Sequence, residues 1–319
     1  MPSRSGPDRG PSWVEVATGQ AGQRVDNFLM ARLKGVPKGR IYRMLRTGEV
    51  RINGGRCRAG RRLEAGDSVR IPPVQTQPND RGAVPTAARD AVGSAFLFED
   101  AEVAILAKPA GMAVHSGSGL AYGVIEALQA ARPEAEWGLA HRLDRGTSGC
   151  LVVGKSAGAT RRLQQAFRDG EVTKAYLALV VGDWPQGPEW VEAALRRQKT
   201  KGGRRSIPDP EGQEAQTRFV PLRRLAGFTL VRAELVTGRT HQIRAHARWA
   251  DHPLAGDTEY GDPDVNARLK PQGLERPFLH SAEVRLPHPT TGEELAVEAP
   301  LPDELSRLLE SLAHGNGRG

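Results

Sequence analysis

The chain has 319 residues, of which 39% are hydrophobic and 26% charged, a composition typical of one large folded domain with room for a smaller one. Its two cysteines are too few for a disulfide framework, and no apolar run approaches the roughly 20 residues of a membrane span. Disulfide-rich secreted scaffolds and membrane proteins are therefore excluded, and a cytoplasmic location is expected. Lys and Arg number 45 against 37 Asp and Glu, a net charge of +8, so a polyanion such as nucleic acid is the first partner to consider.

The first segment, residues 1–22, is expected to be a disordered leader. Its start is polar and rich in Pro, Gly and Ser, and it lacks the apolar core of a signal peptide. We therefore expect the fold to begin only after this segment.

Residues 23–73 are predicted to form a compact unit of two helices and a small sheet. Apolar residues recur at helical spacing over residues 25–33 and 38–47, and short alternating stretches follow them. Between Arg24 and Arg70 there are 13 basic and 4 acidic residues, a local excess of +9 that exceeds the net charge of the whole chain. This concentration of charge predicts contacts with a phosphate backbone. The side chains expected to make these contacts are Lys38, Arg40, Arg43, Arg46 and Arg51.

A polar, Pro-rich segment at residues 74–93 is expected to be a linker. From residue 94 to 313, alternating apolar segments such as 228–235 predict many strands, interrupted by a few helices. The fold class is therefore α+β, in which the small N-terminal unit precedes a domain built on a mixed, largely antiparallel sheet. Helices are predicted at residues 122–131, 157–168 and 303–313, and a disordered tail at 314–319.

The sharpest candidate for chemistry is the segment 141–149, His-Arg-Leu-Asp-Arg-Gly-Thr-Ser-Gly. Small and hydroxyl-bearing residues follow Asp144, which predicts a loop between two strands. Arg142 and Arg145 flank the carboxylate and favour its ionised form, as a nucleophile requires at neutral pH. An Asp in such a loop can also serve only to form the turn, so local chemistry leaves both interpretations open.

Two further segments place polar side chains where they could face a cleft. Arg239 lies where a strand leads into a helix, a position from which it could hold a carboxylate or a phosphate. His241 and His246 in the same segment are five residues apart, about 140° around a helix, so a metal site is not expected. Tyr176 begins a strand and is either a core tyrosine or a platform on which a nucleobase stacks.

These segments resemble two known families. Residues 48–54 and 63–67 resemble the S4 domain, a small module that binds structured RNA, and the resemblance extends over the whole N-terminal unit. The segment 141–149 resembles the central motif of the family that includes the ribosomal large-subunit pseudouridine synthases. Matching segments follow the family's order at 107–115, 176, 238–246 and 278–282. Residues 33–38 and 115–120 are similar to the C-type branch of that family, from which Gly146 and the basic stretch Arg196–Arg205 are modest departures.

The resemblance implies conversion of uridine to pseudouridine in large-subunit (23S) ribosomal RNA, without a cofactor or a metal. It implies that Asp144 is the nucleophile, attacking either C6 of the base or C1′ of the ribose. It also implies that Arg239 pairs with Asp144, that Tyr176 stacks on the target base, and that Arg142 occupies the space which the flipped base leaves. A monomer is expected.

Three alternatives compete with this interpretation. A glycosidase would need two carboxylates and an activated water. A ribosome-assembly factor without activity could use the same S4 domain, although it would not need Asp144, Tyr176 and Arg239 together. A synthase could also act on another RNA, such as transfer RNA, and the sequence leaves open which uridines are modified.

Overall fold

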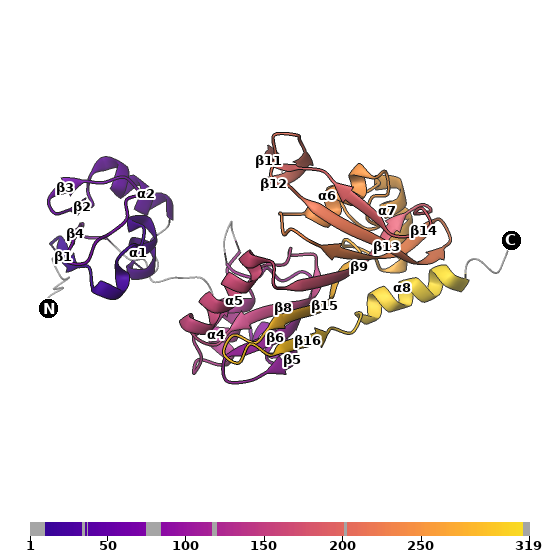
Figure 1. The fold of residues 1–319 in the computed structure, drawn as a ribbon, viewed down its shortest axis with the longest axis horizontal. Coiled ribbons are helices and arrows are strands. Elements are labelled where there is room, and N and C mark those ends of the chain that lie inside the picture. Colours follow the sequence, from indigo (N-terminus) through magenta and orange to yellow (C-terminus); the bar gives the residue numbers. More distant parts are fainter. Residues whose placement is uncertain are drawn as a thin grey trace, which may run out of the picture. The chain divides into compact units, whose positions relative to one another are not determined.

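The computed structural model describes residues 10–33, 36, 38–74, 84–116, 120–200 and 203–314. It divides into two compact units, Met1–Ala83 and Val84–Gly319, each with its own core (Figure 1). We describe them one at a time. Within the described ranges, no helix is long and apolar enough to cross a membrane.

The N-terminal unit packs two helices against a small sheet, as predicted. The apolar sides of both helices, including Phe28, Leu29 and Met44, are buried against strand residues such as Val69. The helices are α1 (Val25–Arg32) and α2 (Lys38–Thr47), and a short 3-10 helix, η1 (Thr18–Gln20), precedes them. The sheet has the order β1-β4-β2-β3, with β1 (Ser12–Glu15), β2 (Arg51–Ile52), β3 (Gly55–Arg56) and β4 (Ser68–Ile71).

Strand β1 corrects the expectation of a disordered leader over residues 1–22. It pairs antiparallel with β4, with Val14 opposite Val69. The leader's short Trp-Val-Glu-Val stretch gave little local signal because its pairing partner lies more than fifty residues later. Residues 1–9 lie outside the described residues.

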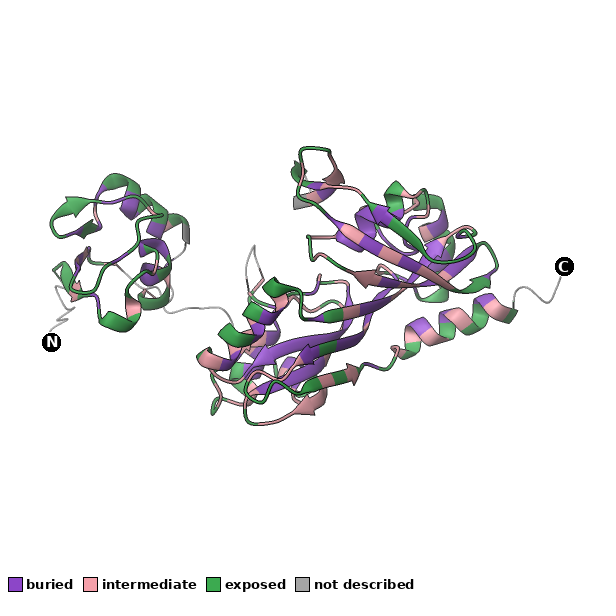
Figure 2. Ribbon diagram, viewed as in Figure 1, coloured by how far each residue is buried: buried purple, intermediate pink, exposed green. Residues whose placement is uncertain are grey.

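The second unit is built on a mixed ten-stranded sheet with the order β10-β13-β14-β9-β15-β8-β6-β5; β16 pairs with β15 and β7 with β8. Its pairs are antiparallel, as predicted, except that β15 and β8 run parallel. The central strands are buried along much of their length, notably β6 and β8 (Figure 2). The strands are β5 (Phe96–Glu99), β6 (Val103–Lys108), β7 (Gly138–Leu139), β8 (Ser148–Gly154), β9 (Thr173–Val181), β10 (Glu189–Glu192), β13 (Gln216–Leu225), β14 (Phe228–Leu235), β15 (Leu279–Pro287) and β16 (Glu294–Glu298).

A separate hairpin, β11 (Leu195–Thr200) with β12 (Gly203–Pro208), carries the basic stretch singled out in the sequence. Helix α6 follows β14 after a short turn, and α8 ends the described chain. The helices of this unit are α3 (Thr86–Gly93), α4 (Val124–Ala131), α5 (Ala157–Asp169), α6 (Gln242–Trp249), α7 (Pro263–Leu269) and α8 (Asp303–His314), with a 3-10 turn η2 (Lys270–Gln272).

Helix α3 corrects the predicted linker at residues 74–93. Ala88 and Val92, four residues apart, share a buried face of this helix, and Val92 joins the main core of the second unit. Pro85 immediately precedes the helix, a position that proline tolerates because the first helical N–H groups have no partner within the helix. Prolines that indicated a linker therefore mark, in part, the start of a helix. Residues 75–83 and the predicted tail at 315–319 lie outside the described residues.

Candidate active site

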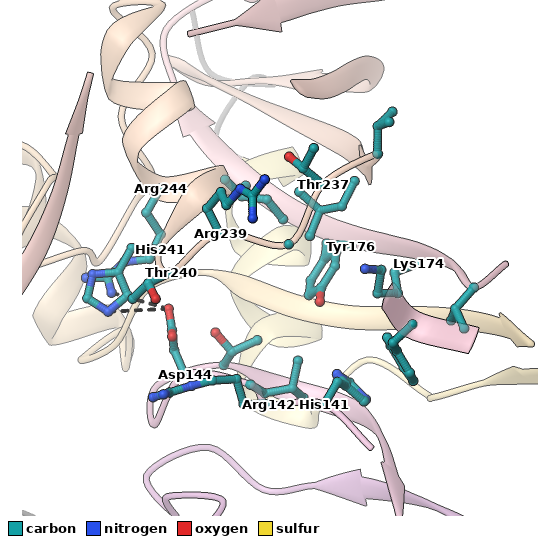
Figure 3. A pocket seen from close by; sticks show the side chains of 18 of the residues that line it. His141, Arg142, Asp144, Lys174, Tyr176, Thr237, Arg239, Thr240, His241 and Arg244 are labelled. Atoms are coloured by element: carbon teal, nitrogen blue, oxygen red, sulfur yellow. Dashed lines mark ion pairs between the residues drawn. The ribbon is translucent and has the colours of Figure 1, made fainter. Parts of the chain in front are cut away.

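A cavity of about 540 Å³ opens between the loop that follows β7, strand β9 and the turn from β14 into α6 (Figure 3). Among its described lining residues Asp144 is the one carboxylate. Six Lys and Arg side chains surround it, so the cavity suits an anionic ligand. They are Arg142, Arg168, Lys174, Arg197, Arg239 and Arg244.

Asp144 lies on the loop between β7 and β8, as the sequence predicted, and this catalytic loop (residues 141–147) is anchored at both ends. His141 stacks on Phe167 with ring centroids 4.5 Å apart, and its Nε2 accepts the N–H of Val152 at 3.0 Å. Burial lowers the pKa of His141 to about 3, so this anchor stays neutral. At the other end, Arg276 donates to the carbonyl of Gly146 at 3.2 Å.

The Asp144 carboxylate contacts two basic side chains through one of its oxygens. Nη1 of Arg244 lies 3.5 Å and Nε2 of His241 lies 3.7 Å from Oδ2. Oδ2 makes the shortest contact with each of these two side chains, and the Asp144 side chain, 21% exposed, lines the cavity.

The expected ion pair between Arg239 and Asp144 is not formed among the described residues. Nε of Arg239 donates instead to the carbonyl of Glu214 at 3.0 Å, although the side chain lines the same cavity. The reason is the start of α6 at Gln242: Arg239 falls in the turn before the helix, whereas Arg244 lies in its first turn. The segment 238–246 does contact Asp144, but the arginine that makes the contact is Arg244 and not Arg239.

Arg244 is held by a forked contact with a second carboxylate. Its Nε and Nη2 donate to Asp257 at 2.6 and 2.8 Å, and Nη2 also lies 3.2 Å from Glu259. Asp257 is fully buried, which alone would raise its pKa, but the hydrogen bonds and charge of Arg244 outweigh burial and lower it. A planar guanidinium fixed in this way presents its remaining nitrogen to Asp144 in one geometry.

Tyr176 lies on β9 and lines the cavity together with Asp144 (Figure 3). The side chain is 6% exposed, and burial, together with the negative charge of Asp144, raises the pKa of its hydroxyl. The phenol is therefore neutral at neutral pH and offers a ring face rather than a charge. Arg142 lies next to Asp144 in the lining, on the exposed side of the loop.

The two histidines of the segment 238–246 lie apart in the structure. His246 is fully buried and bonds to Oγ1 of Thr217 and the carbonyl of Ala193, both at 2.9 Å. His241 faces Asp144, a contact that sequence reasoning missed because it depends on a left-handed backbone at His241, with φ of 54°. Among the described residues, no three His, Cys, Asp or Glu side chains gather as a metal site would require.

The basic side chains that were predicted to contact RNA in the N-terminal unit differ in their ion pairs and in their exposure. Arg40 is paired two-pronged with Glu49, at 2.9 and 2.6 Å, which offsets its charge. Arg43 and Arg46 are exposed on α2, and Arg51 is exposed on β2. The side chain of Lys38 lies outside the described residues.

An RNA-binding module followed by a domain with one carboxylate in a basic pocket defines an RNA-modifying enzyme. The chain belongs to the RNA pseudouridylate synthases: that family's model matches residues 102–249, and the S4 domain model matches residues 23–69. It is 47% identical over 305 residues to ribosomal large subunit pseudouridine synthase C of Escherichia coli, covering 94% of this chain and 96% of that protein. The protein of the same name from Pasteurella multocida is 45% identical, covering 94% and 93%.

A solved structure agrees with this assignment. Human RNA pseudouridylate synthase domain containing 4 is 25% identical, with a TM-score of 0.60, and the match covers 71% of this chain and 95% of that one.

Proposed function

We propose that this enzyme converts specific uridines of large-subunit (23S) ribosomal RNA to pseudouridine, with Asp144 as the nucleophile. The observation that carries the proposal is the asymmetric setting of Asp144, the one carboxylate lining the described cavity. Arg244 and His241 contact its Oδ2, and the side chain is 21% exposed where it lines the cavity. The names of the relatives from Escherichia coli and Pasteurella multocida support the choice of RNA.

The reaction is an isomerisation, so the atoms of uridine are all retained. The Asp144 carboxylate forms a bond to C1′ or C6, the N1–C1′ bond breaks, and the base turns and rejoins C1′ through C5. The bond to Asp144 is broken again before the product leaves, which restores the carboxylate. The proton leaves C5 and N1 gains one, so the reaction needs no external donor and no cofactor. Arg244, 3.5 Å from Oδ2, places a positive charge beside the carboxylate that makes the attack.

The rest of the cavity suits a base that has left its stack. Such flipping costs a few kcal/mol, and a ring platform recovers part of it by stacking. In this proposal Tyr176 provides that platform and Arg142, exposed on the catalytic loop, fills the gap in the RNA. The exposed arginines of the N-terminal unit, Arg43, Arg46 and Arg51, bind phosphates elsewhere on the same RNA.

The lining argues against a hydrolytic enzyme. Glycosidases use two carboxylates about 5 to 10 Å apart on either side of the scissile bond. Asp144 has no such partner among the described lining residues of this cavity. A hydrolase would release the free base, whereas the isomerase keeps the base and rejoins it to the ribose.

The test of the proposed nucleophile is Asp144→Asn, which keeps the size of the side chain and removes its charge. We expect no pseudouridine from a large-subunit RNA transcript, with RNA affinity within about 3-fold of the parent. The assay is single-turnover release of tritium from uridine labelled at C5. Asp251→Asn, at an exposed position outside the cavity, is the matched control and should keep the parent rate. Product from Asp144→Asn at even a few per cent of the parent rate would rule out this nucleophile.

A further inference from the structure

Tyr260 joins the basic hairpin to the active site without lining the cavity itself. The side chain is 3% exposed, and its hydroxyl oxygen is 2.7 Å from the backbone nitrogen of Ser206 on β12. The same oxygen lies 3.1 Å from Nδ1 of His241. A single hydroxyl group therefore contacts the hairpin on one side and a neighbour of Asp144 on the other.

The positions of the hydrogens in this chain of contacts follow from what each group can do. The N–H of Ser206 can only donate, so the Tyr260 oxygen accepts there. Nδ1 of His241, 3.1 Å away, is an acceptor that the phenol's own proton can reach. Oε2 of Glu259 also lies 3.5 Å from Nδ1, without a hydrogen bond between the two in the described part of the chain. Burial raises the pKa of Tyr260 to about 12, so that proton stays on the phenol at neutral pH. With the phenol's proton directed to Nδ1, that nitrogen accepts, and a neutral His241 then carries its hydrogen on Nε2.

The hydrogen on Nε2 matters because this nitrogen faces Asp144. Nε2 lies 3.7 Å from Oδ2, the oxygen that Arg244 also contacts. Burial lowers the pKa of His241, against the attraction of Asp144, so the neutral ring prevails at neutral pH. With Nε2–H the ring turns the positive end of a bond dipole toward the carboxylate, whereas the other tautomer would turn a lone pair toward it.

The ring of Tyr260 is fixed from several sides, so its hydroxyl has little freedom to turn away. The guanidinium carbons of Arg205 and Arg244 lie 5.0 and 4.8 Å from the ring centroid. The His241 ring meets it edge-on, with centroids 5.6 Å apart and planes at 89°.

The hairpin is anchored to the turn before α6 by two further hydrogen bonds. Oγ of Ser206 donates to the carbonyl of Thr240 at 2.6 Å, and Nη2 of Arg197 donates to Oγ1 of Thr240 at 2.6 Å. Thr240 immediately precedes His241, so the hairpin meets the site through both the backbone and Tyr260.

We propose that Tyr260 is a positioning residue that fixes His241 in the tautomer with hydrogen on Nε2, and so links the β11–β12 hairpin to the carboxylate of Asp144. The expected effect on the reaction rate rests on the proposed role of Asp144. The assignment of the tautomer does not depend on that role. Tautomer selection by a second hydrogen-bond partner is a general way in which proteins set the chemistry of a histidine ring.

The first measurement is the tautomer, read from ¹⁵N–¹H spectra of the full-length protein with ¹⁵N-labelled histidine rings. His241 is assigned from the signals that disappear in His241→Gln. In the parent protein we expect Nδ1 to have the shift of an unprotonated nitrogen and Nε2 that of a protonated one. The tautomer itself is read from the parent spectrum, and hydrogen on Nδ1 would overturn the proposal.

The second measurement links the tautomer to the reaction through Tyr260→Phe, which keeps the ring and removes the hydroxyl. We expect mixed tautomers at His241, a single-turnover rate at least ~10-fold lower, equivalent to about 1.4 kcal/mol of activation free energy, and RNA affinity within about 3-fold. Tyr122→Phe, a tyrosine of the same unit outside the cavity, should leave both readouts at parent values. Mixed tautomers with an unchanged rate would overturn the link to catalysis. An active Asp144→Asn enzyme would refute the proposed nucleophile and this link, and would leave the assignment of the tautomer intact.

Discussion

At the scale of single residues, Arg244 is the side chain that links the carboxylates of Asp257 and Asp144. Its guanidinium makes a forked contact with buried Asp257 and extends a third nitrogen toward Asp144. Replacement by Lys keeps the charge but cannot reproduce three directed contacts from one planar group. We expect Arg244→Lys to lower the single-turnover rate by about 100-fold, or about 2.7 kcal/mol, with a smaller effect on RNA affinity.

The matched comparison is Arg239→Lys, five residues earlier in the same motif. Its Nε contacts the carbonyl of Glu214 and not Asp144, and an ammonium can also donate to a carbonyl. The turnover of this variant should stay within about 3-fold of the parent. If the two variants behaved in the opposite way, Arg239 and not Arg244 would be the arginine that supports the carboxylate during the reaction.

The residues of the site were predictable from the sequence to different degrees. Asp144 could be singled out because its flanking arginines and the following small residues are local signals. The partner arginine could not, because the choice between Arg239 and Arg244 depends on where α6 begins. The contact of His241 with Asp144 depends on a left-handed backbone, which is uncommon at residues other than glycine. Tyr260 reaches the site only through tertiary packing.

At the scale of elements, the end of β6 is tied to the catalytic loop by Lys108. This lysine is 1% exposed, and its amine donates to the carbonyls of Pro109 and Met112 at 2.8 Å and to that of Arg145 at 3.4 Å. One side chain therefore closes the turn after its own strand and holds the residue next to Asp144. Burial and the nearby charge of Arg276 lower the pKa of Lys108 to about 7, against the attraction of Asp144.

This lowered pKa predicts a specific dependence of stability on pH. Between about pH 7 and 10.5, the unfolded chain binds a proton at Lys108 that the folded chain does not, so the free energy of unfolding should rise with pH across this window. The contribution is at most about 1.4 kcal/mol per pH unit. Urea unfolding of the parent and of Lys108→Met should give curves whose difference grows from pH 7 to 10. Parallel curves would show that the three carbonyls keep the amine charged in the folded protein.

Elements with a strong local pattern were predicted well, and those defined by distant partners were not. Helix α2 and strand β14 have the predicted limits because their apolar spacing is regular over eight or more residues. Strand β1 and helix α3 fell in segments interpreted as leader and linker. Both are short, and their burial comes from β4 and α4, which lie far from them along the chain.

At the scale of the whole molecule, the chain divides into two units, of which the first carries the proposed RNA contacts and the second the proposed active site. A truncation that leaves the second unit intact removes the chain up to Ala83, since α3 belongs to the second unit. Removal of residues 1–83 should lower RNA affinity and flatten its dependence on salt, because each lost phosphate contact reduces the slope by about 0.7 to 0.9. At saturating RNA, the single-turnover rate should stay within about 3-fold of the parent. Titrations at several salt concentrations test this, and an unchanged slope would place the RNA grip in the second unit.

The parallel pairing of β15 with β8 has a consequence for the growing polypeptide. Ser148 and Gly149, at the exit of the catalytic loop, pair with His280 and Ser281. The fit is so close that a Cβ on Gly149 would lie 2.1 Å from the Ser281 carbonyl oxygen. The loop therefore gains this support only after 281 − 149 = 132 further residues have been synthesised, which takes on the order of ten seconds. The S4 domain leaves the ribosome first. A chain that stopped short of β15 would contain the whole S4 domain but would lack the strand that supports the loop of Asp144.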